Sequence, residues 1–96
     1  MHLTLIPQRR DDNLVVTKLG DTLIINDINY DFSVIPEGAS LPASATDCLY
    51  LTGNIERITG ILYLTLILPH GPNPSQAATF PSSIINPTDG LLELPK

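Results

Sequence analysis

One histidine stands out among the residues of this 96-residue chain that could do chemistry, because it lies where a sheet-like run ends. His70 is in the segment LILPHGPNPSQ, at the junction of the most apolar run and a proline-rich loop. A histidine acts as a general base or metal ligand only with a second group, such as a carboxylate, a nucleophile or further ligands. The nearby polar residues Asn73, Ser75 and Gln76 include no carboxylate. We therefore interpret His70 as a solvated loop residue.

The single cysteine, Cys48, precedes LYL on a predicted strand. No helix start or glycine-rich turn is predicted there to lower the pKa of its thiol, so we expect a buried, unreactive side chain. The sequence has no Cys-x-x-Cys or His-x-x-x-His pair, which are common spacings of zinc ligands. We therefore expect no metal ion and no cofactor.

Carboxylates offer the remaining chemistry, since a pair about 5–10 Å apart suits glycoside hydrolysis. Asp27 and Asp89 fall in predicted turns, where aspartate bonds to the local backbone. Glu56 and Arg57 are neighbours on a predicted strand, so they point to opposite faces and do not form a pair. No Gly-x-Ser-x-Gly motif is present, and so no serine nucleophile of that type is indicated. The sequence predicts no catalytic residues and a protein that is not an enzyme.

An alternative stays open, in which the chain is a small ligand- or carbohydrate-binding protein or a weak hydrolase. Its site would lie between the PEG loop and the HGPNPSQ loop, which both follow predicted strands. Asp31, Glu37 and His70 are the candidate site residues. This alternative requires a pocket that brings His70 within hydrogen-bonding reach of Asp31, Glu37 or Asp47.

Charge and hydropathy exclude two classes of partner. Ten acidic residues against five scattered basic ones give a formal charge of −5, whereas nucleic-acid binding needs clustered Lys and Arg, so we expect no nucleic-acid partner. The longest apolar run, from Ile61 to Leu68, is far shorter than the ~20 residues of a membrane-spanning helix, so no membrane is expected. The N-terminus lacks the pattern of a signal peptide, and we expect a cytoplasmic chain at synthesis.

Nine prolines and six glycines punctuate runs of β-branched and aromatic residues, which is typical of an all-β domain. We predict a single domain over 1–96, a small antiparallel sheet fold made of a meander plus hairpins, either sandwich-like or a partly open barrel. At most one helical turn is expected, at Pro74–Thr79. Extended Pro/Gly-rich loops are predicted at 34–47 and 69–83.

The N-terminal half predicts a short strand, Leu3–Ile6, and then a three-stranded meander with turns at Gly20-Asp21 and Asn26-Asp27. The meander strands are Leu14–Leu19, Thr22–Asn26 and Ile28–Ser33. These turns place Val16 opposite Ile25, Leu23 opposite Tyr30, and Ile25 opposite Ile28. The predicted core face is Leu14, Val16, Leu23, Ile25, Ile28, Tyr30 and Phe32.

The C-terminal half predicts two further hairpins. The first hairpin pairs Cys48–Ile58 with Ile61–Leu68 about Thr59-Gly60. A loop with an even number of residues keeps Leu51 and Ile55 on the same face as Leu62, Leu64, Leu66 and Leu68. We expect four loop residues rather than two, because threonine is a poor residue for positive φ. The segment SIINPTDGLLEL predicts a last hairpin that Gly90 closes.

The strand from Ile61 to Leu68 is apolar on both faces, which is the pattern of a strand covered on both sides. A domain of 96 residues with at most one helical turn has few other elements that could cover both faces of this strand. We therefore predict that a second copy covers one face, as a symmetric dimer. The predicted interaction face comprises Leu62, Tyr63, Leu64, Leu66 and Leu68.

Three segments together resemble small, uncharacterised proteins encoded in phage and prophage tail regions. They are Ile25–Pro42 with DFSVIPEGASLP, Gly53–Pro69 with IERITGILYLTLILP, and Phe80–Gly90 with FPSSIINPTDG, in that order. Asp27 departs from the pattern, in which glycine is common. The resemblance implies a structural or accessory interaction protein in tail or tail-fibre assembly, with tail components as partners and association with the virion. These motifs consist of turn and strand residues, so they imply genomic context rather than a mechanism.

Overall fold

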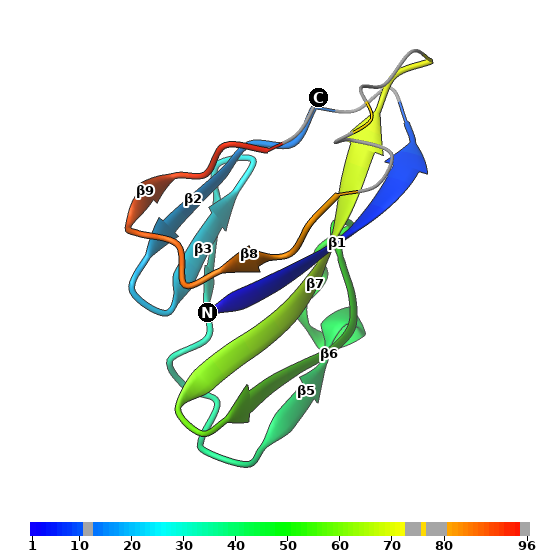
Figure 1. The fold of residues 1–96 in the computed structure, drawn as a ribbon. Helices are drawn as coiled ribbons and strands as arrows, with labels where there is room; N and C mark the ends of the chain where they lie inside the picture. The colour runs from blue at the N-terminus through cyan, green and yellow to red at the C-terminus, as the bar shows by residue number, and fades with distance from the viewer. Residues whose placement is uncertain (11–12, 73–75, 77–80, 95–96) are drawn as a thin grey trace.

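The computed structural model describes residues 1–10, 13–72, 76 and 81–94, which form two β-sheets packed face to face (Figure 1). The five-stranded sheet has the order β5 (Ser40–Pro42), β6 (Leu51–Ile58), β7 (Ile61–His70), β1 (His2–Arg9) and β8 (Ile84–Ile85). The four-stranded sheet has the order β4 (Ile28–Asp31), β3 (Thr22–Ile25), β2 (Val16–Leu19) and β9 (Gly90–Leu91). The all-β prediction is confirmed, and since the sheets do not close into a barrel, the sandwich-like form is the one observed.

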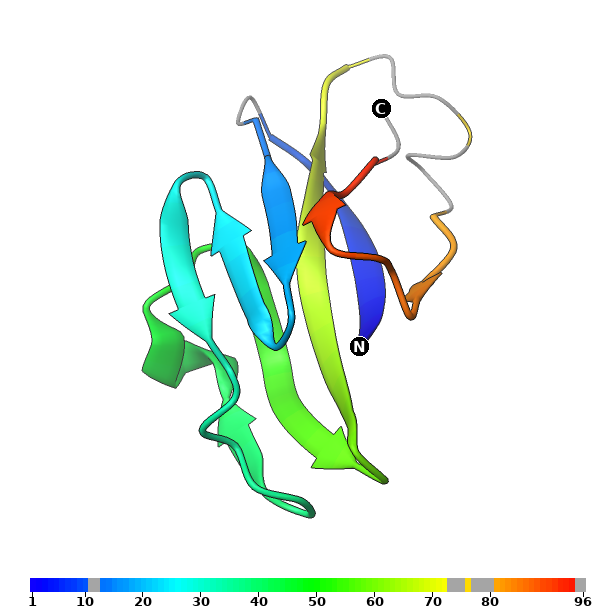
Figure 2. The ribbon, with the colours of Figure 1, turned by 90° about the vertical axis from the view of Figure 1, so that its left-hand side faces the viewer.

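The predicted meander has the expected register. Val16 pairs with Ile25, Leu23 with Tyr30, and Ile25 with Ile28. Of the predicted core face, Val16, Leu23, Ile25 and Phe32 are buried, while Leu14 and Tyr30 are half-buried. Ile28 is 57% exposed, so its predicted burial is wrong. It lies on β4, the edge strand of its sheet (cyan in Figure 2), which pairs with β3 on one side and with no described strand on the other.

The β6–β7 hairpin has a two-residue loop, because Ile58 pairs directly with Ile61. The predicted four-residue loop is therefore wrong. Thr59 adopts φ 52° and Gly60 φ 76°, a pair of positive φ values that a tight turn matched to the strand twist needs. Both carboxylate oxygens of Glu37 accept hydrogen bonds from the Gly60 N–H, at 2.9 and 3.1 Å, and so hold this turn from outside the hairpin.

The prediction that a loop with an even number of residues keeps Leu51 and Ile55 on the face of the β7 leucines is confirmed, since all of these residues are buried in one core. The register shifts between Thr52 and Glu56, where Gly53 takes φ 71°. A bulge of this kind bends the strand without turning its apolar residues to solvent.

β1 is longer than predicted and pairs with β7 in parallel, with Leu3 beside Leu64 and Leu5 beside Leu66. The sheet is thus mixed rather than wholly antiparallel. The chain leaves β1 to build the other sheet and returns later to form β7, so strands far apart in sequence become neighbours. This pairing buries Leu3 and Leu5 in the core.

The predicted last hairpin is wrong, since its two halves join different sheets. β8 pairs with β1, and β9 pairs with β2. Asp89 precedes β9 and makes long-range bonds rather than the local ones expected of a turn: its Oδ1 lies 2.7 Å from Lys18 Nζ and accepts a hydrogen bond from the Gly20 N–H at 3.1 Å. The segment from 86 to 89 therefore crosses between the sheets.

The two loops predicted at 34–47 and 69–83 are shorter in the structure. The segment 34–47 contains β5 and a 3-10 turn, η1 (Ala43–Thr46). β7 continues through Pro69 to His70, so the second loop begins at Gly71. The candidate helical turn at 74–79 lies, apart from Gln76, outside the described residues.

Candidate functional site

Glu37 and His70 lie at opposite ends of the same strand. The Glu37 carboxylate binds the N–H of Gly60, which directly precedes β7, and His70 is the last residue of β7. Nine steps of about 3.3 Å along a strand separate the two ends by roughly 30 Å. The structure therefore does not bring Glu37 and His70 together.

The other two carboxylates also lie away from His70. Asp31 is exposed on the edge strand β4, where its Oδ1 accepts a hydrogen bond from the Ser33 N–H at 2.9 Å. Hydrogen bonds from Ser33 lower the pKa of Asp31. Asp47 lines a shallow hollow of about 220 Å³ with Tyr30 and Cys48. The structure thus places Asp31, Glu37 and Asp47 in three separate surroundings, none of which includes His70.

His70 is half-buried at a strand end, rather than solvated in a loop as predicted. Its Nδ1 lies 2.9 Å from the Gly71 carbonyl oxygen. It lines an open cleft of about 820 Å³ between the ends of the two sheets. Glu93 is the one carboxylate among the described lining residues, and most of its neighbours there are apolar, namely Leu14, Val15, Leu68, Pro69, Leu91, Leu92 and Leu94.

The predicted interaction face divides between the two sides of β7. Four of its members are at most 2% exposed and pack between the sheets: Leu62, Leu64, Leu66 and Leu68. They form the core of one chain, so they do not offer a surface to a second copy. Tyr63 lies on the opposite side of β7 and is 37% exposed.

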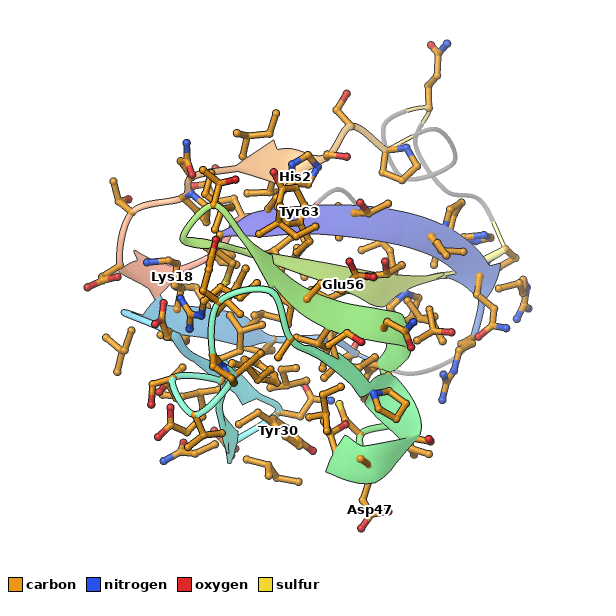
Figure 3. All side chains as sticks on the ribbon, turned by 90° about the horizontal axis from the view of Figure 1, so that it is seen from below. His2, Lys18, Tyr30, Asp47, Glu56 and Tyr63 are labelled. Atoms are coloured by element: carbon orange, nitrogen blue, oxygen red, sulfur yellow. The ribbon has the colours of Figure 1, made fainter. Side chains whose placement is uncertain are left out.

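Tyr63 is central to a continuous surface, the outer face, which is the side of the five-stranded sheet turned away from the four-stranded sheet. The cross-strand pairs align Ile85, His2, Tyr63, Glu56 and Ser40 in one row over all five strands. The His2 and Tyr63 rings stack with their centroids 5.2 Å apart (Figure 3). Three aliphatic residues on this face are substantially exposed: Ile6 at 45%, Ile58 at 48% and Ile85 at 64%.

Arg57 is a structurally important residue that the sequence analysis did not identify. It follows Glu56 on β6 and points the other way, as the strand alternation predicts. Its Nε donates to the Ile35 carbonyl at 2.6 Å, and its Nη2 lies 3.1 Å from Asp21 Oδ2 and 3.3 Å from the Phe32 carbonyl. An arginine at an inward strand position was the available signal, because a charge there requires partners.

Tyr30 and Cys48 bring the edge of the four-stranded sheet against the segment before β6. Burial, a hydrogen bond with Cys48 and the nearby charges of Cys48 and Asp47 raise the pKa of Tyr30 above its ordinary value. Cys48 is half-buried, not fully buried as predicted. Its expected lack of reactivity stays a prediction.

Among the described residues, no group of three or more His, Cys, Asp or Glu side chains is placed to hold a metal ion. In the same part of the chain, the structure has no helix with the length and apolar character needed to span a membrane. Comparisons of the chain with protein-family models, with curated proteins and with solved structures found no match.

Proposed function

We propose that this chain is a non-enzymatic β-sandwich interaction protein of phage or prophage origin that binds a protein partner during tail or tail-fibre assembly. The observation that carries the binding role is the outer face. It presents the stacked His2 and Tyr63 rings beside the exposed side chains of Ile6, Ile58 and Ile85. Tyrosine is enriched where proteins bind one another, and exposed apolar patches mark such surfaces.

The resemblance of the three sequence segments to phage tail-region proteins supports the assembly context. The same segments build the fold that carries the outer face: IERITGILYLTLILP forms the second half of β6 and nearly all of β7, which hold Glu56 and Tyr63. We place the protein in the cytoplasm at synthesis and in the virion afterwards, with tail components as its partners.

Co-expression with each tail and tail-fibre product of the same phage or prophage locus tests this function. We expect one product to co-purify with the wild-type chain, and Tyr63→Lys to weaken its binding at least tenfold, because a desolvated aromatic anchor is replaced by a charge. Leu19→Lys, at a leucine that is 51% exposed on β2 of the other sheet, is the matched control and should bind normally. Normal tails after deletion of the gene, with no co-purifying product, would overturn the proposal.

A further inference from the structure

We infer that β4 is a dimerisation edge, on which the same strand of a second copy docks antiparallel about a two-fold axis. The two four-stranded sheets then form one continuous eight-stranded sheet. This inference is independent of the outer face, which belongs to the other sheet.

The backbone of β4 supplies the first observation. Ile25 and Ile28 flank a two-residue turn, and Phe32 N–H donates to the Asp21 carbonyl at 3.0 Å. Hydrogen-bonded pairs alternate along an antiparallel ladder, so Ile28, Tyr30 and Phe32 face β3. Asn29 and Asp31 therefore direct their N–H and C=O groups outward, where no described strand pairs with them. Such an open edge is a template for another strand.

The apolar side of the edge supplies the second observation. Ile28 is on the core side of its sheet by register, yet it is 57% exposed. Leu49, 74% exposed, lines the same shallow hollow beside Ile28 and Tyr30. A core-facing isoleucine next to an open strand edge is the arrangement that an added strand completes, since its inward side chains would cover Ile28.

Charge selects both the occupant and the register. In an antiparallel ladder, residues whose N–H and C=O groups point outward must lie opposite each other to exchange hydrogen bonds. The two-fold axis of the dimer must therefore pass through Asn29, Tyr30 or Asp31. An axis at Asp31 sets that carboxylate against its own copy, and an axis at Asn29 sets Asp31 against Asp27, which is unfavourable in both cases. An axis at Tyr30 places Asn29 opposite Asp31 of the second copy, twice. The amide donates to the carboxylate there, and a second copy of β4 complements the edge without an opposed pair of like charges.

The same axis brings Ile28 opposite Phe32 of the second copy and the two Tyr30 rings together on the inner side. Each Asn29–Asp31 pair exchanges two backbone hydrogen bonds, so the edge forms four in all. The dimer predicted from the sequence thus forms at a strand edge, and not through the leucines of β7, which are at most 2% exposed.

Light scattering after size exclusion tests the edge. At about 100 µM, a concentration at which a micromolar dimer is populated, we expect about twice the 10.4 kDa mass of one chain. Ile28→Lys should give the monomer mass, because the edge then carries a charge that an added strand would bury. Ile85→Lys is the matched control, an isoleucine 64% exposed on the other sheet, and it should remain a dimer. A monomeric wild type, or a dimeric Ile28→Lys, would overturn the inference.

A charge exchange tests the register. Asn29→Asp sets the introduced carboxylate opposite Asp31 of the second copy and should give a monomer, whereas Asp31→Asn leaves no like charges opposed and should stay dimeric. Combining Asn29→Asp with Asp31→Asn restores one acid and one amide in each pair and should restore the dimer. Circular dichroism confirms that each variant is folded. A double variant that stays monomeric overturns the inference. The effect of Tyr63→Lys on binding of a tail partner is a separate measurement, so failure of the dimer and failure of the proposed function can be told apart.

Discussion

Arg57 and Asp21 join the two sheets of the sandwich, with Nη2 and Oδ2 3.1 Å apart. Arg57 comes from β6 of one sheet, and Asp21 from the β2–β3 turn of the other. The arginine side chain is 15% exposed and the aspartate 44%. The guanidinium also satisfies the carbonyls of Phe32 and Ile35, and so it fixes the chain where it leaves the first sheet for the second.

Arg57→Ala should lower the free energy of unfolding by about 2–4 kcal/mol, because it removes donors from two carbonyls and a partner from a half-exposed carboxylate. Asp21→Ala should cost below about 1 kcal/mol, since that carboxylate is partly solvated. Urea denaturation of both variants measures the difference. Equal losses would show that the ion pair, and not the two carbonyl bonds, carries the effect.

Thr59→Asn should stabilise the protein by about 0.5–1 kcal/mol. Thr59 is β-branched and holds φ 52° in the β6–β7 turn, a conformation that costs most residues about 1–2 kcal/mol and asparagine less. Thr4→Asn, at an exposed position within β1, is the control and should be neutral or destabilising because asparagine is poor in strands. Thermal unfolding of the two variants measures this, and a lower melting temperature for Thr59→Asn would contradict the strain at the turn.

The register of the meander could be predicted from the sequence because its turns are built of residues that accept positive φ. Asn26 and Asp27 both adopt it, at 49° and 69°, and the strands follow from there. The Thr59-Gly60 turn could not be assigned in the same way. The local preference of threonine favours a longer loop, but the aligned leucines of β7 and the Glu37 cap on Gly60 together outweigh it.

Contacts between segments that are distant along the chain could not be predicted from the sequence. Nothing local indicates that β1 pairs with β7 in parallel, or that Asp89 crosses to Lys18, 71 positions away. The separation of two candidate site residues has the same origin: Glu37 and His70 both follow predicted strands, yet the strand order sets them at opposite ends of β7. Sheet order is a property of the whole chain, and alternation within one strand does not contain it.

Lys18→Met should raise the pKa of Asp89. The hydrogen bond from Lys18 is the main cause that holds this pKa below its ordinary value near 3.8, with the Gly20 N–H second. A carboxyl whose pKa is lowered by folding contributes stability above its unfolded pKa, and this contribution is lost as the pH falls through the folded pKa. We expect less acid destabilisation below about pH 4 in Lys18→Met than in the wild type.

An NMR titration of the Asp89 carboxyl measures the shift directly. Asp31 is the internal control in the same spectra, because Ser33 rather than Lys18 lowers its pKa. The Asp31 titration should be the same in the wild type and in Lys18→Met. An Asp89 midpoint that does not move in the variant would contradict the role of the lysine.

Tyr30 should make the fold sensitive to alkali. Its pKa is raised above an ordinary value of 10.0, first by burial and then by Cys48 and Asp47. The unfolded chain therefore loses the tyrosine proton at lower pH than the folded chain does. The stability that Tyr30 contributes is complete below pH 10 and is lost as the pH rises from there through the folded pKa.

Tyr30→Phe should therefore lose less stability than the wild type between about pH 9.5 and 11, although it is less stable at neutral pH because the hydroxyl no longer bonds to Cys48. Cys48→Ala removes the second and third causes of the shift and should lower the pKa of Tyr30, which absorbance at 295 nm follows once the Tyr30→Phe titration is subtracted. Urea denaturation across the same range gives the stabilities. Parallel stability curves for the wild type and Tyr30→Phe would show that Tyr30 titrates alike in the folded and unfolded chains.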